Sequence, residues 1–194
     1  MTTSQNQEKE AIEHVVQRAR EGCADAFDLL VDAYSSRVYG FVFRLVGHRD
    51  EAEEITQDVF VRLVRTIMNY QDCGKFEAWL FRIAANRVRD YVRRQVRRPA
   101  IRSLTVDSEH ESAPELLVDK QSKAPAERLQ EHDDHDRLQR ALAQLSDSER
   151  EVVLLRHYSQ LSFQAIAEIM NTPLGTALAR GHRGVAKLRE LMEE

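Results

Sequence analysis

The sequence predicts an all-α protein made of two small helical domains joined by a flexible linker. Its 194 residues include only seven glycines and four prolines, about half of average usage for these turn-forming residues, which disfavours an all-β sandwich or barrel. Three of the four prolines fall within 99–125, an acidic stretch without sustained helical periodicity. We therefore expect domains at 8–98 and 132–194, with the linker at 99–131.

The composition is that of a globular protein, with 31% charged and 42% hydrophobic residues. No apolar run approaches the roughly 18 residues of a membrane span, and the polar first ten residues lack the apolar core of a secretory signal. The two cysteines, Cys23 and Cys73, make no disulfide framework. A cytoplasmic protein without a membrane span is the expectation.

The first domain has helical periodicity throughout. Apolar residues recur at spacings of three and four from Phe27 to Val38. A turn at 47–50 follows, and Asp50 is the predicted N-cap of a helix whose first turn is rich in glutamate, as the helix dipole favours. After a polar loop at 69–75, a last long helix begins at Phe76 and carries arginines in its C-terminal half. Trp79 lies at helical spacing from Phe76 and Ile83 on that helix, which predicts that it belongs to the core.

The second domain has the pattern of a helix-turn-helix. Ser146 and Glu149 form a predicted capping box at the start of one helix. Ser162 caps a short helix at 163–170, a turn at 171–173 follows, and a helix runs from 174 to about 192, with Thr172 as its cap. Two helices joined by so short a turn are typical of a DNA-binding helix-turn-helix.

Charge is distributed unevenly along the chain, although the net charge is only −4. Residues 82–102 contain eight arginines and a single acidic residue, Asp90, whereas residues 1–81 carry nine basic and fourteen acidic residues. This pattern indicates one surface that faces a polyanion and another that faces a basic partner.

Taken together, these segments resemble the extracytoplasmic-function (group 4) sigma factors of the sigma-70 family, two-domain initiation factors of bacterial RNA polymerase. The resemblance covers nearly all of residues 10–192, and four blocks stand in the family's order. The blocks are 26–34 (AFDLLVDAY), 50–60 (DEAEEITQDVF), 76–90 (FEAWLFRIAANRVRD) and 161–176 (LSFQAIAEIMNTPLGT). The implied fold is region 2, a helical bundle, followed by region 4, a helix-turn-helix.

The resemblance implies that the helix at 50–65 docks on the β′ clamp helices of core RNA polymerase, which also contacts the factor through β. An acidic face there suits the arginines of the clamp helices, with Val59 or Phe60 adding apolar contact. On charge alone, a solvated acidic helix face is the alternative. The implied polymerase-binding residues are Glu51, Glu53, Glu54, Gln57, Asp58 and Arg62.

The loop at 69–76 and the following helix correspond to the part of the family that reads and melts the promoter −10 element. Unpaired bases need a stacking face and a hydrogen-bonding edge, here Tyr70 and Asn86, beside a basic track for the phosphates. The implied −10 residues are Tyr70, Asn86, Arg82, Arg89, Arg93, Arg94 and Arg97. A solvated arginine-rich helix end is the alternative.

The last helix would enter the major groove at the −35 element. The implied residues are Thr176, Leu178, Arg180, His182, Arg183 and Lys187. The chain departs from the family pattern here, because Leu178 replaces a DNA-reaching residue and Gly181 and Gly184 replace bulkier ones. A glycine inside a helix costs about 1 kcal/mol relative to alanine, so either the −35 sequence is unusual, with Leu178 on thymine methyls, or this domain is weakened.

No catalytic motif, cofactor site or metal site is predicted. His132 and His135 lie among aspartates, but exposed His and Asp side chains at the entrance of a helix are more often simply solvated than bound to a metal. The resemblance implies a DNA-binding sigma factor, not an enzyme, with core polymerase, promoter DNA and an anti-sigma factor as partners. Two alternatives remain: a sigma-like decoy that binds an anti-sigma factor without reading promoters, and a repressor that uses only residues 132–194 on duplex DNA.

Overall fold

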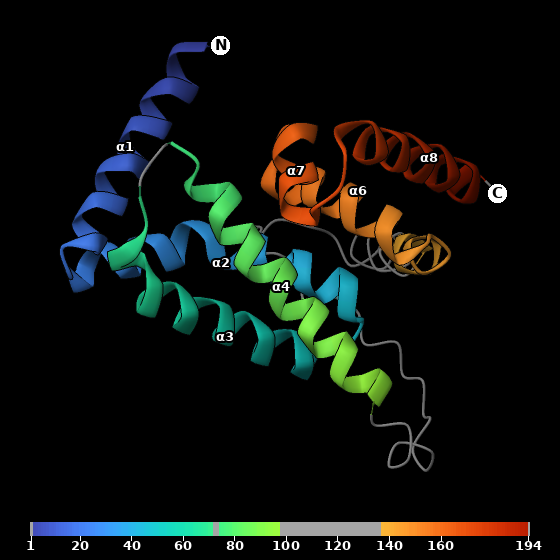
Figure 1. The fold of residues 1–194 in the computed structure, drawn as a ribbon, viewed down its shortest axis with the longest axis horizontal. Coiled ribbons are helices and arrows are strands. Elements are labelled where there is room, and N and C mark those ends of the chain that lie inside the picture. Colours follow the sequence, from blue (N-terminus) through green and yellow to red (C-terminus); the bar gives the residue numbers. More distant parts are fainter. Residues whose placement is uncertain (1, 72–73, 98–136, 194) are drawn as a thin grey trace, which may run out of the picture.

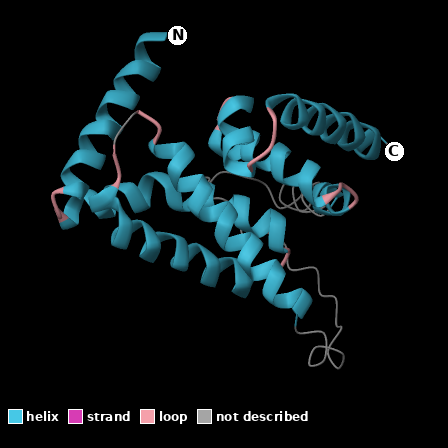
Figure 2. Ribbon diagram, viewed as in Figure 1, coloured by secondary structure: helices cyan, strands magenta, loops and turns pink. Residues whose placement is uncertain are grey.

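The computed structural model describes residues 2–71, 74–97 and 137–193, and every regular element in these ranges is a helix (Figure 2). This confirms the predicted all-α class. The predicted linker at 99–131 falls outside these ranges. The helices are α1 (Thr2–Arg20), α2 (Ala24–Val46), α3 (Arg49–Thr66), the short 3-10 helix η1 (Ile67–Asn69), α4 (Phe76–Arg97), α6 (Asp147–Ser159), α7 (Phe163–Met170) and α8 (Leu174–Glu193).

The first domain is a bundle in which α2 contacts α1, α3 and α4 (Figure 1). Its core is built from the apolar stripes of these helices, and Phe41 of α2 meets Phe81 of α4 edge to face, with ring centroids 5.7 Å apart. Leu30, Leu63 and Leu80 are fully or almost fully buried around them. Burial of these side chains is the main driving force for the bundle.

The turn between α2 and α3 corrects one prediction. α2 ends at Gly47, whose φ of +83° is a left-handed conformation that favours glycine. α3 begins at Arg49 with His48 as its N-cap, so the prediction that Asp50 is the cap was wrong. Asp50 lies instead in the first turn, where its charge still favours the helix dipole.

The second domain consists of a helical segment at 137–143 followed by α6, α7 and α8. Ser146 and Glu149 form the predicted capping box at the start of α6, and the Ser162 hydroxyl accepts a hydrogen bond from the Ala165 N–H at the start of α7. Asn171 ends α7 in a left-handed conformation. The Thr172 hydroxyl donates to the Pro173 carbonyl oxygen, and α8 begins one residue later, at Leu174.

The glycines of α8 lie where this helix crosses its neighbours. A Cβ at Gly181 would be 2.5 Å from Cε1 of Phe163, and one at Gly184 would be 2.8 Å from Cγ2 of Val153. Together with the fully buried Ala177, they let α8 approach α6 and α7 closely. These small residues therefore reflect tight packing, and they give no sign of a weakened domain.

The two domains pack directly against each other. α2 and α4 of the first domain contact α6 and α7 of the second (Figure 1). One buried apolar cluster includes residues of both domains, from Val16 to Ile169. At the centre of this contact, Gly40 of α2 faces Tyr158 of α6. The structure therefore places the second domain over one side of the helical bundle.

Candidate polymerase and nucleic-acid interfaces

The outward face of α3 is mostly acidic. Glu53, Glu54 and Gln57 are exposed, as is Arg62 further along the helix. The side chain of Glu53 accepts from Arg49 at 3.0 Å, and Asp58 pairs with Arg87 of α4 at 3.3 Å. Glu51 is half-buried. Because Ile55 and Leu63 are buried on the opposite face of α3, these polar groups share a surface open to a partner.

The apolar part of this surface differs from the prediction. Val59 is fully buried and Phe60 packs against the core, so Val59 cannot supply contact to a partner. Val61 and Val64 of α3 and Met68 of η1 are instead 46%, 47% and 67% exposed. These three residues are three and four positions apart, the spacing of neighbours on one side of a helix. The sequence contained this signal, but the sequence analysis had considered only Val59 and Phe60 as apolar contacts.

Tyr70 of the loop before α4 is only 8% exposed. Its ring stacks on Trp79 with centroids 4.6 Å apart, and it meets Phe76 edge to face at 6.0 Å. Trp79 is half-buried against the core, in line with its predicted core spacing. Tyr70 before α4 and Trp79 on α4 therefore form an aromatic pair, although in this arrangement little of the tyrosine is open to a base.

The polar residues of α4 predicted for the −10 element lie on its exposed side. Asn86 and Arg82 are exposed, and the amide oxygen of Asn86 accepts a hydrogen bond from Arg89 Nη1 at 2.7 Å. Arg93 and Arg94 are exposed one turn further on, where both interact with Asp90. The side chain of Arg97 is beyond what the structure describes.

Arg89 reaches across to the second domain. Its Nη2 lies 2.6 Å from Glu151 Oε1 of α6 and donates a longer bond of 3.3 Å to the carbonyl of Ile169 in α7. Beside it, a crevice of about 380 Å³ separates residues 69–71, Lys75 and α4 from α7. Tyr70, Trp79 and Arg82 line one wall, and Glu168 and Ile169 line the other.

The residues of α8 that were predicted to read the −35 element differ from one another in exposure. Thr176, Leu178 and Arg180 are half-buried, and His182 is exposed and stacks on Phe163, 6.4 Å between centroids. Two further cations contact their own domain: Arg183 donates to Glu149 at 2.9 Å, and Lys187 donates to the Gln144 carbonyl at 2.6 Å.

The pKa of Glu149 is lowered below its usual range. The hydrogen bond from Arg183 is the largest cause, and the hydrogen bond from the Ser146 side chain is the next. Elsewhere in the protein, burial and the neighbouring Glu77 carboxylate raise the pKa of Tyr34, so this core tyrosine stays neutral. The second domain therefore contains an ionised carboxylate that ties the capping box of α6 to α8.

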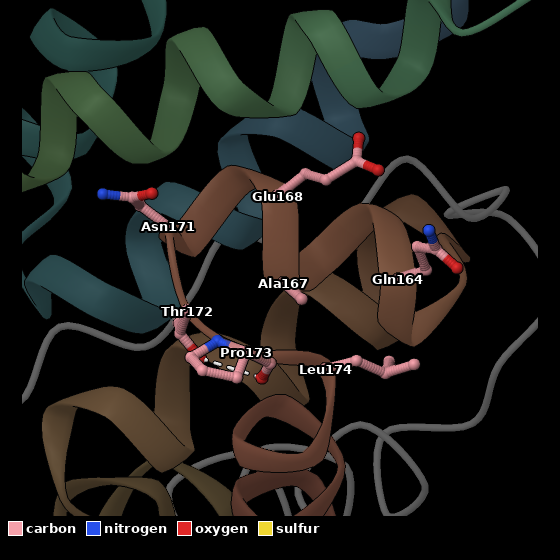
Figure 3. Close-up of a pocket in the computed structure, with 7 residues that line it drawn as sticks. All are labelled: Gln164, Ala167, Glu168, Asn171, Thr172, Pro173 and Leu174. Carbon is pink, nitrogen blue, oxygen red and sulfur yellow. Dashed lines mark hydrogen bonds between the residues drawn. The ribbon is translucent and has the colours of Figure 1, made fainter.

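The turn between α7 and α8 borders a pocket of about 490 Å³ (Figure 3). Gln164 and Glu168 of α7 and Leu174 of α8 are among its lining residues, and Glu168 extends toward α4 in the same view. The pocket has no cluster of charges that would mark a ligand site. Among the described side chains, no group of His, Cys, Asp and Glu could hold a metal, and the predicted histidine–aspartate cluster at 132–136 is not among them.

None of the described helices is both long and apolar enough to cross a membrane. The described helices combine three features, a helix-turn-helix, an arginine-bearing helix beside an aromatic pair, and a separate acidic helix face, and this combination is typical of helical proteins that bind nucleic acid.

Two family models match the chain, Sigma-70 region 2 at residues 30–98 and Sigma-70, region 4, at residues 135–188. The ECF RNA polymerase sigma factor SigW of Bacillus subtilis is 31% identical over 92% of this chain and 95% of its own length. The sigma factor CarQ of Myxococcus xanthus is 34% identical over 92% and 96%.

Among solved structures, the sigma factor RpoE of Bartonella quintana, in complex with the anti-sigma factor NepR, has a TM-score of 0.67 at 21% identity. That likeness covers 86% of this chain and 96% of the RpoE chain, and it shows the shared fold. CnrH in complex with the cytosolic domain of CnrY has a TM-score of 0.64 at 22% identity, over 92% and 95%.

The chain belongs to the extracytoplasmic-function sigma factors of the sigma-70 family. It is therefore an alternative sigma factor, a transcription initiation factor and not an enzyme, which works with core RNA polymerase and promoter DNA.

Proposed function

We propose that α3 docks the protein on the β′ clamp helices, that the 69–75 loop and α4 capture and melt the −10 element, and that α8 reads the −35 element. In this scheme residues 8–98 and 132–194 act as separate modules joined by a linker at 99–131, and the protein works in the cytoplasm, where polymerase and promoters meet.

The observation that carries the proposal is the grouping of three kinds of side chain along α4. The Tyr70–Trp79 stack supplies an aromatic face, Asn86 supplies an exposed amide, and Arg93 and Arg94 continue the same helix as exposed cations. Melted DNA needs a stacking surface, a donor and acceptor for a base edge, and a positive track for phosphates. A solvated helix end would need only the charges.

The Asn86→Ala variant in the reconstituted holoenzyme tests this assignment. Loss of one or two hydrogen bonds to a base should lower open-complex formation about threefold to tenfold, measured as permanganate reactivity of unpaired thymines. Binding to core polymerase should stay unchanged, and Gln17→Ala, an exposed amide on α1, is the matched control. Equal loss of opening and of core binding would assign Asn86 to folding and overturn its role at the −10 element.

An anti-sigma factor completes the proposed set of partners. The structurally similar RpoE is seen in complex with the anti-sigma factor NepR, and CnrH is seen in complex with the cytosolic domain of CnrY. We propose that a protein of this kind covers the α3 and α4 surfaces when the factor is silent. A decoy that bound such a regulator but not DNA would bind core polymerase, or only the regulator, without promoter opening, so the permanganate assay also separates these functions.

A further inference from the structure

Arg183 of α8 is held through one of the three nitrogens of its guanidinium group. Its Nε donates to Oε1 of Glu149, the third residue of α6, at 2.9 Å. Among the described residues, neither of its Nη atoms makes a hydrogen bond or an ion pair. The Arg183 side chain is 63% exposed, whereas that of Glu149 is 16% exposed. The N–H donors on both Nη atoms therefore stay available to a partner, in a rigid planar fork.

The carboxylate of Glu149 is itself fixed by the start of α6. Its Oε2 accepts from the Ser146 hydroxyl at 2.7 Å and from the Ser146 N–H at 3.4 Å. These bonds leave Oε1 for Arg183. The bonds from Arg183 and Ser146 also lower the pKa of Glu149, so the carboxylate is ionised at neutral pH. A charge-assisted bond to an acceptor that is held in place restricts the rotamers of the arginine.

The backbone on the C-terminal side of Arg183 is also held close to α6. A Cβ on Gly184 would lie 2.8 Å from the nearest side-chain atom and 3.4 Å from the Glu149 carbonyl oxygen. One turn further along α8, Lys187 Nζ donates to the Gln144 carbonyl at 2.6 Å. The position of Arg183 relative to Glu149 therefore depends on helix packing as well as on the bond between the two side chains.

The pair of Arg183 and Glu149 is suited to a base more than to a phosphate. Because the two charges cancel, the attraction of the pair for an anionic phosphate is weak at a distance. The free N–H donors of Arg183 still match a neutral base edge. In the major groove, guanine presents two acceptors side by side, O6 and N7, which an arginine fork meets with two hydrogen bonds.

We propose that Glu149 is a positioning residue for recognition of the −35 element: it holds Arg183 by Nε so that both Nη groups meet O6 and N7 of one guanine. The proposal rests on the proposed placement of α8 in the major groove. Glu149 makes no contact with DNA in this arrangement and acts through Arg183. A side chain that is ordered before binding loses less conformational freedom on binding, so the positioning strengthens the contact with guanine.

Three variants separate positioning from helix capping. Glu149→Ala removes the acceptor that holds Arg183, and it also removes the capping box. Ser146→Ala removes the cap hydroxyl but keeps both members of the ion pair, so it is the matched control for lost helix stability. Glu149→Gln keeps an acceptor oxygen and suits a capping box, so it provides the test if Glu149→Ala fails to fold. Arg183→Ala defines the base pair that this arginine reads.

The experiment uses the reconstituted holoenzyme and a pool of promoter duplexes with a randomised upstream element of about ten base pairs, one turn of DNA. Sequencing of the bound fraction gives the preference for each base at each position. We expect Arg183→Ala to abolish a preference of about tenfold for guanine at one position.

Glu149→Ala should lower the guanine preference at that same position roughly threefold to fivefold, the usual effect of one lost hydrogen bond, and should leave the other positions unchanged. Glu149→Gln should lower it less, and Ser146→Ala should keep the wild-type preference. A double variant of Glu149→Ala and Arg183→Ala should match Arg183→Ala alone, because Glu149 acts through Arg183.

An unchanged guanine preference in both Glu149 variants would overturn the positioning role, as would an equal loss in Ser146→Ala. If Arg183→Ala changed nothing, or weakened binding equally for every sequence, the guanine contact would be wrong. These results leave α8 as the reader of the −35 element, because preferences at the other positions persist. If the wild-type holoenzyme shows no preference at any randomised position, the proposed reading of the −35 element is wrong, and the role of Glu149 falls with it.

Discussion

Gly181 of α8 lies directly against the ring of Phe163 in α7, so closely that a Cβ on residue 181 would come within 2.5 Å of the ring. Gly184 has the same relationship to Val153 of α6. The angle at which the recognition helix leaves the helix-turn-helix therefore depends on the absence of two side chains. Residues that look helix-breaking in the sequence are therefore the ones that let α8 pack closely on α6 and α7.

Gly181→Ala tests this packing. Overpacking a filled core costs about 1–3 kcal/mol, which should outweigh the gain of up to about 1 kcal/mol in helix propensity, so we expect a lower free energy of unfolding in urea. Gly175→Ala, in open space on the same helix, should instead stabilise the protein slightly. Equal stabilisation by both variants would contradict the close crossing of α7 and α8.

The carboxylate of Glu149 should make stability depend on pH. Its pKa in the folded protein is lowered, chiefly by the bond from Arg183 and then by that from Ser146. The stabilisation is therefore fully present above the ordinary carboxyl pKa of about 4.5 and is lost as pH falls through the lower folded pKa. Glu149→Gln should lose stability relative to wild type at pH 7 and approach it at pH 3. A difference that does not depend on pH would exclude this role.

Charge reversal at Glu54 tests the polymerase interface. Glu54 is exposed on α3, so Glu54→Arg should leave the fold intact and repel a basic partner. We expect binding to core polymerase to weaken about tenfold at low salt, and the difference to shrink as salt screens it. Asp32→Arg, the same reversal on exposed α2, is the control. Equal weakening by both would indicate a general charge effect and not a docking face.

Replacement of Arg93, Arg94 and Arg97 by alanine tests the basic track of α4. Each phosphate contact that is lost should lower the slope of log affinity against log salt by roughly 0.7 for a single strand or 0.9 for a duplex. The slope is measured for holoenzyme on promoter DNA across a salt series. An unchanged slope would remove these arginines from the DNA face.

The sequence was sufficient for the features that depend on local rules. Helical periodicity, the Ser146–Glu149 capping box and the Ser162 cap follow from neighbours within four residues, and the structure confirms them. The predicted N-cap of α3, Asp50, was wrong because the turn after α2 is shorter than expected: Gly47 is the C-cap of α2, His48 is already the N-cap of α3, and α3 begins at Arg49.

Contacts between residues that are far apart in the chain could not be predicted from the sequence. The partner of Arg89 lies 62 residues away, and nothing in the local sequence around Glu151 distinguishes it from the other carboxylates of α6. Gly40 was the available signal, since a glycine in the middle of an apolar helix needs a close neighbour to explain it. The burial of Tyr70 could not be predicted for the same reason. It depends on contacts with the Phe76 and Trp79 rings and on the position of α7 opposite Tyr70.

In-vitro transcription from genomic fragments with purified core polymerase, with and without this protein, tests the central claim most directly. The account predicts new, discrete start sites that depend on the protein, that share an upstream sequence, and that weaken with Asn86→Ala. Binding to core polymerase without any new start would contradict promoter recognition by the α4 surface and would favour a decoy that occupies regulators.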